Sequence, residues 1–346
     1  MNAPITVQPR KAKDYVSEED VRWCPGCGDY AILKAVQKTL AERGADPDNT
    51  VFVSGIGCSS RFPFYMNTYG FHTIHGRAPA VATGVKLANP GLDVWVVTGD
   101  GDALSIGGNH LLHVLRRNVD LNLLLFNNEV YGLTKGQVSP TSPLGMASPS
   151  TPRGSLDGPA NAAAFALGAG ARFVARAIDT QAARLGAVLH RAADFRGTAL
   201  VEILQNCIVY HDGAFAGLTD RAAAAANQLH VEHGRPLRYG QDDRFGLRLN
   251  PRSLQLEAVT VGEDGIDEGD IVVHDATNPT LAGMLARLAP PLPTALGVLY
   301  CAPDVTFEER VAADRSGRTA PDAGSINALL RKGGVWRSAA QPARGA

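Results

Sequence analysis

The sequence contains little cysteine, few aromatic residues and no excess of charge of either sign. Five of its 346 residues are cysteine, three are tryptophan, and 6% are aromatic. The 33 basic and 34 acidic residues give a formal net charge of −1, which argues against binding to nucleic acid or an anionic membrane. No apolar run is long enough to cross a bilayer, and the N-terminal residues lack the apolar core of a signal peptide. We therefore expect a cytoplasmic protein.

The few cysteines are not expected to form disulfides in a reducing compartment. Cys24 and Cys27 form a close pair in the stretch CPGC, whereas Cys58 and Cys207 are singletons that each follow an apolar segment. Four thiolates satisfy either a tetrahedral Zn²⁺ or a 4Fe–4S cluster, and spacing alone does not choose between them. A structural zinc site more often shows two close pairs, and singletons near strand ends favour an electron acceptor beside a cofactor. Cys301 matches no motif and is expected to be a small buried hydrophobe.

Apolar segments alternate with helical patterns along most of the chain. Apolar runs predict buried strands at 50–54, 92–98, 121–126 and 198–204, and a further short strand at 271–274. Helical periodicity predicts helices at 31–41, 78–89, 106–116, 160–170, 181–195, 221–228 and 280–288. Strands that are apolar throughout and alternate with helices indicate an α/β fold, in which a parallel sheet has helices on both faces.

Three segments are expected along the chain. Residues 1–15 are polar and predict a flexible arm, and residues 16–215 predict the α/β domain. Residues 140–158 are rich in Pro, Ser and Gly and predict a long ordered loop within that domain. Residues 216–346 carry a weaker pattern and predict a C-terminal extension, for which contact with another subunit is our hypothesis.

Carboxylate and amide side chains follow two of the predicted strands. Gly99-Asp100-Gly101-Asp102 follows the strand at 92–98, and Asn127-Asn128 follows the strand at 121–126. Ligands of open parallel sheets bind beyond the carboxyl ends of the strands, so the side chains of Asp100 and Asn128 should face one point. Their oxygens suit an octahedral Mg²⁺, and the glycines let the backbone approach a diphosphate. Either motif alone would be an ordinary turn or strand cap, but their spacing by one βαβ unit favours a metal–diphosphate site.

Four further stretches are distinctive: WCPGCG at 23–28, GIGCSS at 55–60, HGR at 75–77 and NEVYGLTKGQ at 128–137. GDG followed one βαβ unit later by NN resembles the signature of enzymes that bind thiamine diphosphate through Mg²⁺. Together with the four stretches, it closely resembles the β subunit of 2-oxoacid:ferredoxin oxidoreductases, strongly over residues 15–215. The resemblance implies the thiamin diphosphate-binding fold, as the module that binds the diphosphate end.

The resemblance also implies a set of site residues. Asp100, Asn128 and the carbonyl of Val130 would hold Mg²⁺. The residues that would line thiamine diphosphate are Ile56, Gly57, Cys58, Ser59, His75, Gly101, Asp102, Gly132 and Leu133. The residues that would ligate one 4Fe–4S cluster are Cys24, Cys27, Cys58 and Cys207.

The implied reaction is the coenzyme A-dependent oxidative decarboxylation of a 2-oxo acid, or its reverse, with ferredoxin as electron acceptor. The glutamate that activates the cofactor would come from an α subunit, so the chain would work only in an (αβ)₂ assembly. Arg61 and Lys135 are candidates to bind the second carboxylate of 2-oxoglutarate. Pyruvate or a broad substrate range stays open, as do a non-redox thiamine enzyme subunit and a zinc-stabilised binding subunit.

Overall fold

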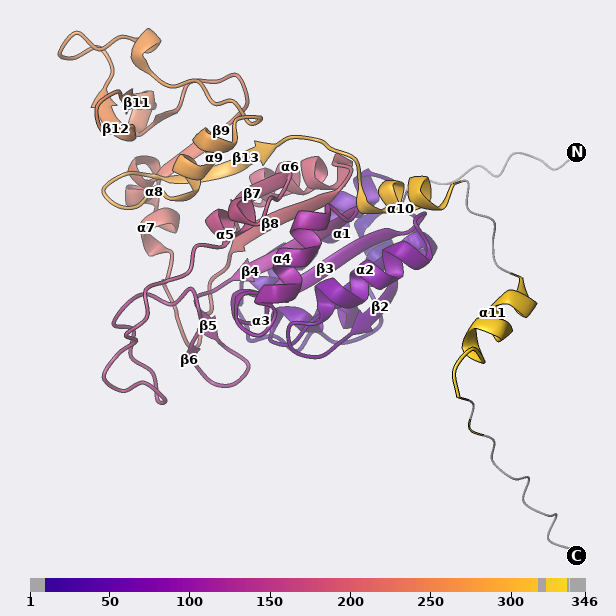
Figure 1. Cartoon of the computed structure of the whole chain (residues 1–346). Coiled ribbons are helices and arrows are strands. Elements are labelled where there is room, and N and C mark those ends of the chain that lie inside the picture. Colours follow the sequence, from indigo (N-terminus) through magenta and orange to yellow (C-terminus); the bar gives the residue numbers. More distant parts are fainter. Residues whose placement is uncertain (1–9, 317–321, 335, 337–346) are drawn as a thin grey trace, which may run out of the picture. The chain divides into compact units, whose positions relative to one another are not determined.

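The computed structural model describes residues 10–316, 322–334 and 336 (Figure 1). The chain divides into two compact units, residues 1–308 and 309–346. Helix α10 (Phe307–Arg315) begins in the first unit and continues into the second, which also contains α11 (Ala323–Leu330). Among the described helices, none combines the length and the apolar character needed to cross a membrane.

The first unit is built on an eight-stranded sheet with the order β2-β1-β3-β4-β8-β7-β13-β9. All neighbouring strands are parallel except β7 and β13. The strands are β1 (Thr50–Ser54), β2 (Tyr69–His72), β3 (Asp93–Gly99), β4 (Leu121–Asn127), β7 (Phe173–Ile178), β8 (Thr198–Leu204), β9 (Gln228–Val231) and β13 (Thr294–Cys301). The four main predicted strands are thus confirmed as β1, β3, β4 and β8.

Helices cover both faces of this sheet, as expected from strands that are apolar on both sides. One face packs against α1 (Asp29–Glu42) and α6 (Ala182–Asp194), through aromatic side chains such as Phe52 and Trp95. The other face packs against α2 (Ala78–Ala88), α4 (Gly108–Arg117), α5 (Ala162–Gly168) and α9 (Pro279–Ala286). The two apolar cores bury the hydrophobic surface that stabilises the fold.

Four strands of the main sheet escape the sequence pattern, namely β2, β7, β9 and β13, and one predicted strand is wrong. β7 carries the buried Arg176, whose Nε donates to Glu202 Oε2 over 2.8 Å, and this polar side chain interrupts the apolar run. β13 is interrupted by Gly297, which has a φ of 116°. Residues 271–274 are not a strand; Val273 forms only an isolated bridge with Pro236. Periodicity is weakest where a buried charge or a backbone irregularity sits inside a strand.

The predicted flexible arm is wrong for its described part, and residues 1–9 lie outside the described residues. Ala12–Tyr15 form a short 3₁₀ helix, and the Tyr15 side chain is fully buried. The Tyr15 hydroxyl donates to the carbonyl oxygen of Leu40 over 3.2 Å, at the end of α1. A single buried aromatic residue therefore anchors a segment whose composition is otherwise polar.

The predicted boundary at residue 215 is also wrong as a structural division. β9 and β13 come from the expected C-terminal extension, yet they complete the main sheet beside β7. The same region contributes α7 (Ala216–Thr219), α8 (Arg221–Asn227) and a small antiparallel sheet of β10 (Arg238–Tyr239), β11 (Phe245–Asn250) and β12 (Gln255–Thr260). Long-range strand pairing joins these residues to the domain, and no local sequence signal reports it.

Candidate cofactor site and cysteine pocket

The strand ends of β3 and β4 lie side by side, because Gly99 pairs with Phe126 in the parallel register. A short helix, α3 (Asp100–Leu104), starts directly after β3, and Asn128 follows β4. Both residues line one cleft of about 100 Å³. The predicted residues that line this cleft are Ile56, Gly57, Cys58, Ser59, His75, Asp100, Gly101, Asp102, Asn128, Val130, Gly132 and Leu133. The fold thus brings together all the residues predicted for the metal and the thiamine cofactor.

Asp100 is buried, with 2% of its surface exposed, and is held by a loop that sequence reasoning did not assign to the site. The hydroxyls of Ser139 and Thr141 donate to Asp100 Oδ2 over 2.5 and 2.6 Å. Burial raises the pKa of this carboxyl, and the two hydroxyl donors oppose that shift. Residues 140–158 contain no helix or ladder strand, so the predicted loop is confirmed. Thr141, near its start, and Ser139, just before it, orient the carboxylate.

A buried polar chain continues from this loop into the sheet. The single hydroxyl proton of Thr141 is shared between Asp100 and Asn127, whose Oδ1 lies 2.9 Å from Thr141 Oγ1. Asn127 Nδ2 donates to Glu202 Oε1 over 2.9 Å. Glu202 in turn pairs with Arg176 on β7. The side chains of Thr141, Asn127, Glu202 and Arg176 therefore form one buried hydrogen-bonded chain that continues from Asp100. Its two charges, on Glu202 and Arg176, pair with each other.

Asp102 organises the opposite wall of the cleft. Its Oδ1 accepts from the backbone N–H groups of Ile56 and Gly76 over 3.1 and 2.7 Å, and its Oδ2 accepts from Thr98 Oγ1 over 2.7 Å. These bonds join two predicted cofactor loops to the end of β3. Because the carboxylate is already engaged, any group entering the cleft would meet Asp102 through its backbone rather than its side chain.

The stretch from Asn128 to Gln137 forms a hairpin, with β5 (Val130–Tyr131) paired to β6 (Gln137–Val138). Its first strand lies close to the second glycine of GDG, because a Cβ atom on Gly101 would stand 2.2 Å from Cε1 of the Tyr131 ring. Glycine is therefore required at position 101, because no side chain fits between the two loops. Asn128 Oδ1 accepts from the backbone N–H of Val130 over 3.2 Å, and this bond holds the Asn128 side chain next to the start of β5.

All four cysteines predicted to share a cluster line a second pocket of about 260 Å³. This pocket adjoins the cofactor cleft, since Cys58, Asn128, Gly132 and Leu133 line both. A Cβ atom on Gly132 would lie 3.5 Å from Sγ of both Cys58 and Cys207. Among the residues that the structure describes, no three His, Cys, Asp or Glu side chains stand close enough to hold a single metal ion. Cys301 lies outside the pocket and packs against the aromatic core.

Two of the pocket's thiols, those of Cys27 and Cys58, have pKa values raised above the ordinary range. Burial, followed by the charge of Asp29, raises the pKa of Cys58 to about 12, and the same two causes raise the pKa of Cys27. The amide of the buried Gln205 donates to Cys27 Sγ over 3.4 Å, a contact that the sequence did not reveal. Metal ligation requires thiolates, so loading this pocket must release protons.

Arg61 and Lys135, predicted near the cofactor, line the cysteine pocket rather than the cleft itself. Arg61 Nε donates to the hydroxyl of Tyr65 over 2.8 Å, and its guanidinium carbon lies 5.9 Å from the Tyr65 ring centroid. Tyr65 therefore orients Arg61, and no carboxylate pairs with this arginine among the described residues. Lys135 is exposed and has a left-handed φ of 78°.

The chain is similar to known proteins over most of its length. The family described as "Thiamine pyrophosphate enzyme, C-terminal TPP binding domain" matches residues 55–203. The 2-oxoglutarate oxidoreductase subunit KorB of Mycobacterium tuberculosis is 54% identical over 83% of this chain and 76% of its own length. A 2-oxoacid:ferredoxin oxidoreductase β subunit of Aeropyrum pernix is 49% identical over 59% of this chain and 64% of its own.

A solved structure is similar over nearly the whole chain. It is the 2-oxoglutarate:ferredoxin oxidoreductase of Magnetococcus marinus, with 2-oxoglutarate, coenzyme A and succinyl-CoA bound. The likeness has a TM-score of 0.75 at 33% identity and covers 94% of this chain and 97% of that one. The fold and the cleft thus define the class of protein: a subunit of an enzyme that binds thiamine diphosphate. The chain belongs to the β subunits of the 2-oxoacid:ferredoxin oxidoreductases, of the 2-oxoglutarate type.

The family membership confirms the resemblance and the α/β fold inferred from the sequence. As an enzyme subunit that binds thiamine diphosphate, the chain has an α subunit as its partner.

Proposed function

We propose that this chain, together with its α subunit, converts 2-oxoglutarate and coenzyme A into succinyl-CoA and CO₂, or runs the reverse reaction. In the forward direction two electrons pass to two ferredoxin molecules, each of which takes one. Bound thiamine diphosphate would supply the carbanion that adds to the keto carbon and the ring that absorbs the electron pair. The observation that carries the proposal is the wall shared by the cofactor cleft and the cysteine pocket.

The donor set of the cleft supports Mg²⁺ at Asp100, Asn128 and the carbonyl of Val130. All three donors are oxygens, which this hard cation prefers, and Mg²⁺ bound by proteins usually also contacts substrate phosphates. Asp100 is buried and oriented by two hydroxyls, as expected of a metal ligand with supporting residues around it. Gly101 and the backbone of Asp102 stand next to this point and would meet the diphosphate.

The donor set of the neighbouring pocket supports a 4Fe–4S cluster at Cys24, Cys27, Cys58 and Cys207. A pocket of about 260 Å³ with four thiols around it suits a cluster, which needs more room than one ion. Gly132 leaves the space between the cleft and the two thiols free of any side chain. Electrons from a cofactor in the cleft would therefore have a short path to the cluster.

The α subunit is needed to close the cofactor cleft. At about 100 Å³ the cleft is smaller than ordinary ligand pockets, which measure roughly 300–1,000 Å³. Ile106 and Leu133 line it, yet they are 56% and 52% exposed. Apolar side chains left open at a cofactor site favour a second protein surface over them, and we infer an (αβ)₂ assembly. A cytoplasmic location stays a prediction.

The proposal is tested by anaerobic co-purification of this chain with its α subunit. We expect a brown complex that reduces ferredoxin when 2-oxoglutarate, coenzyme A, thiamine diphosphate and Mg²⁺ are all present. If the complex reduces ferredoxin with pyruvate but only slowly with 2-oxoglutarate, the proposed reaction type stands and the proposed substrate is wrong. A colourless, zinc-containing complex without ferredoxin reduction would overturn the proposal.

Thr141→Val should weaken the cofactor site without changing its shape. Valine has almost the volume of threonine but cannot donate to Asp100 or Asn127, so the metal ligand loses part of its orientation. We expect the apparent affinity for Mg²⁺ and thiamine diphosphate to fall roughly 10–100-fold, as is usual for such supporting contacts. Titration of the αβ complex with Mg²⁺ measures the change.

Thr151→Val is the matched control, because Thr151 lies in the same loop and its hydroxyl bonds to Ser148 instead. The control should retain the wild-type Mg²⁺ requirement. Equal affinities for the Thr141 variant and the control would contradict the role given to Thr141.

Arg61→Gln should raise KM for 2-oxoglutarate and leave turnover of pyruvate nearly unchanged. Only 2-oxoglutarate carries a second carboxylate, and a charge-assisted hydrogen bond contributes about 1.5–3 kcal/mol. We therefore expect KM to rise roughly 10–100-fold. Arg116→Gln on α4, on the other face of the sheet, should change neither KM. If both substrates lose activity equally, Arg61 has another role.

A further inference from the structure

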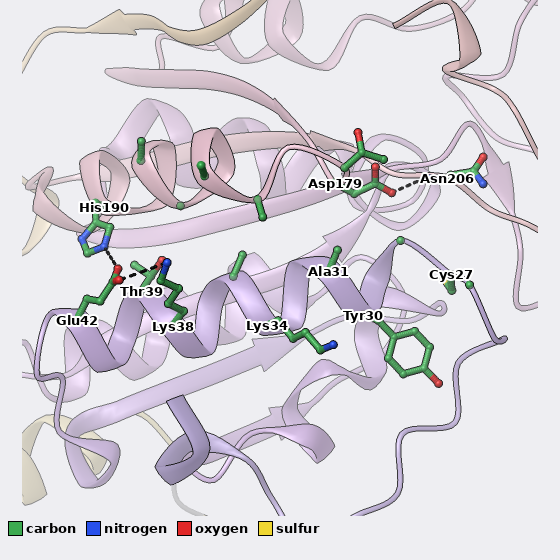
Figure 2. A pocket seen from close by; sticks show the side chains of 18 of the residues that line it. Cys27, Tyr30, Ala31, Lys34, Lys38, Thr39, Glu42, Asp179, His190 and Asn206 are labelled. Carbon is green, nitrogen blue, oxygen red and sulfur yellow. Dashed lines mark hydrogen bonds and ion pairs between the residues drawn. The ribbon is translucent and has the colours of Figure 1, made fainter. Parts of the chain in front are cut away.

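A groove of about 1,150 Å³ runs between α1 and α6, on the face of the sheet that carries the aromatic core (Figure 2). Cys27 and Gly28 line one end, where Asn206 donates its backbone N–H to Asp179 Oδ2 over 3.0 Å. Lys38, Glu42 and His190 line the other end (Figure 2). The groove therefore connects the cysteine loop with the outer surface of the two helices.

The groove exists because both helices present small side chains to each other. Ala31 and Ala35 of α1 and Ala183, Gly186 and Ala187 of α6 line it. Small side chains leave the backbones accessible, so another surface can approach closely without large rearrangement. The volume exceeds that of ordinary small-molecule sites, which fits contact with a protein surface.

The cysteine loop at the groove's end is the most open part of the predicted cluster site. Cys24 is exposed, whereas Cys27, Cys58 and Cys207 are partly buried. Pro25 and Gly26 are exposed as well. A cluster in the pocket would thus come nearest to solvent at this loop, and electrons leaving the chain would pass there.

Positive charge lies along the α1 side of the groove. Lys34 is exposed, and no acidic side chain pairs with it among the described residues. Lys38 Nζ lies 3.6 Å from Glu42 Oε1, while Glu42 Oε2 lies 2.8 Å from His190 Nε2 (Figure 2). Glu42 is thus shared by two bases, and Lys34 is the charge left free to meet an acidic partner.

We propose that the acceptor ferredoxin docks on the Cys24–Cys27 loop and the adjoining groove, with acidic side chains against Lys34. This inference rests on the proposed function, which makes ferredoxin the acceptor of one electron at a time. Two ferredoxins must dock and leave in each turnover, so the interface must be small and short-lived. Redox partners usually meet through small interfaces, and a groove lined largely by small side chains is suited to such an encounter.

Zero-length carbodiimide cross-linking of the αβ complex with an acidic ferredoxin locates the contact without any turnover. Peptide mapping should find Lys34 or Lys38 joined to ferredoxin carboxylates. Cross-links confined to other lysines would overturn the proposal, even if the enzyme reduces ferredoxin well.

Charge reversal tests the same contact kinetically. In the αβ complex, Lys34→Glu should raise KM for ferredoxin roughly tenfold at low salt, and the difference should shrink as salt increases. Reduction of methyl viologen, a small acceptor that needs no docking, should stay at the wild-type rate. Arg116→Glu also reverses a positive charge, but on α4, which lies on the opposite face of the sheet. It should change neither the KM for ferredoxin nor the rate of methyl viologen reduction.

A ferredoxin KM for Lys34→Glu within twofold of wild type would overturn the proposal. Parallel loss of viologen reduction would overturn it too, because the defect would then lie inside the enzyme. A wild-type complex that reduces viologen with 2-oxoglutarate but not ferredoxin would instead contradict the proposed acceptor, and the cross-linking map would still report where an acidic protein binds.

Discussion

Asp100→Asn should lower the activity of the αβ complex by at least about 1,000-fold, through loss of Mg²⁺-dependent thiamine diphosphate binding. Asparagine keeps an oxygen that accepts from Ser139 and Thr141, so the loop and the floor of the cleft should stay in place. The negative charge, however, is lost. The variant therefore separates the electrostatic role of the carboxylate from its structural contacts.

Isothermal titration with thiamine diphosphate at several Mg²⁺ concentrations measures the effect, and circular dichroism checks the fold. Asp93→Asn is the matched control, because Asp93 opens the same strand, β3, at the end away from the cleft. We expect it to bind the cofactor as the wild type does. Unchanged Mg²⁺ dependence in Asp100→Asn would remove Asp100 from the metal site.

Cys207→Ser should abolish ferredoxin reduction, to below roughly 1% of wild type, while the cofactor still binds in the cleft. A serine hydroxyl is a poor substitute for a thiolate, and a cluster that loses one of four ligands is usually lost or converted. Cys207 is chosen because it lines the cysteine pocket but not the cofactor cleft. Cys58 lines both the pocket and the cleft, so a change there could affect cluster ligation and cofactor binding together.

Iron and zinc analysis, together with electron paramagnetic resonance of the reduced complex, gives the readout. Cys301→Ser should keep the full iron content, since Cys301 lies outside the pocket. Thiamine diphosphate affinity of Cys207→Ser should remain within about threefold of wild type. Full iron content and normal ferredoxin reduction in this variant would contradict the assignment of Cys207 as a ligand.

The sequence alone determined the sheet's central strands and the residues of the cleft. β1, β3, β4 and β8 are apolar on both sides, because helices cover both faces, and such runs are visible without a structure. Asp100 and Asn128 were found because parallel strands end at one edge of the sheet, so a carboxylate after one strand and an amide after the next must be neighbours. The short motifs then identified the family, which the comparisons confirm.

Only the tertiary structure decided what supports those residues. Ser139 and Thr141 lie in a loop whose composition gives no sign of which carboxylate it will contact. Gln205 reaches Cys27 across 178 positions of sequence, and β13 joins β7 from more than a hundred residues away. Contacts of this kind depend on the packing of whole elements, and no local pattern encodes them.

The same limit explains the error at the N-terminal end of the described chain. Polar composition predicts a flexible arm there, because composition cannot show that Tyr15 is buried against α1. The α1–α6 groove, too, is invisible in the sequence, because nothing in a single helix shows that its small residues will face those of another helix. Sequence determined which groups are present and where strands end, and the fold decided which groups meet.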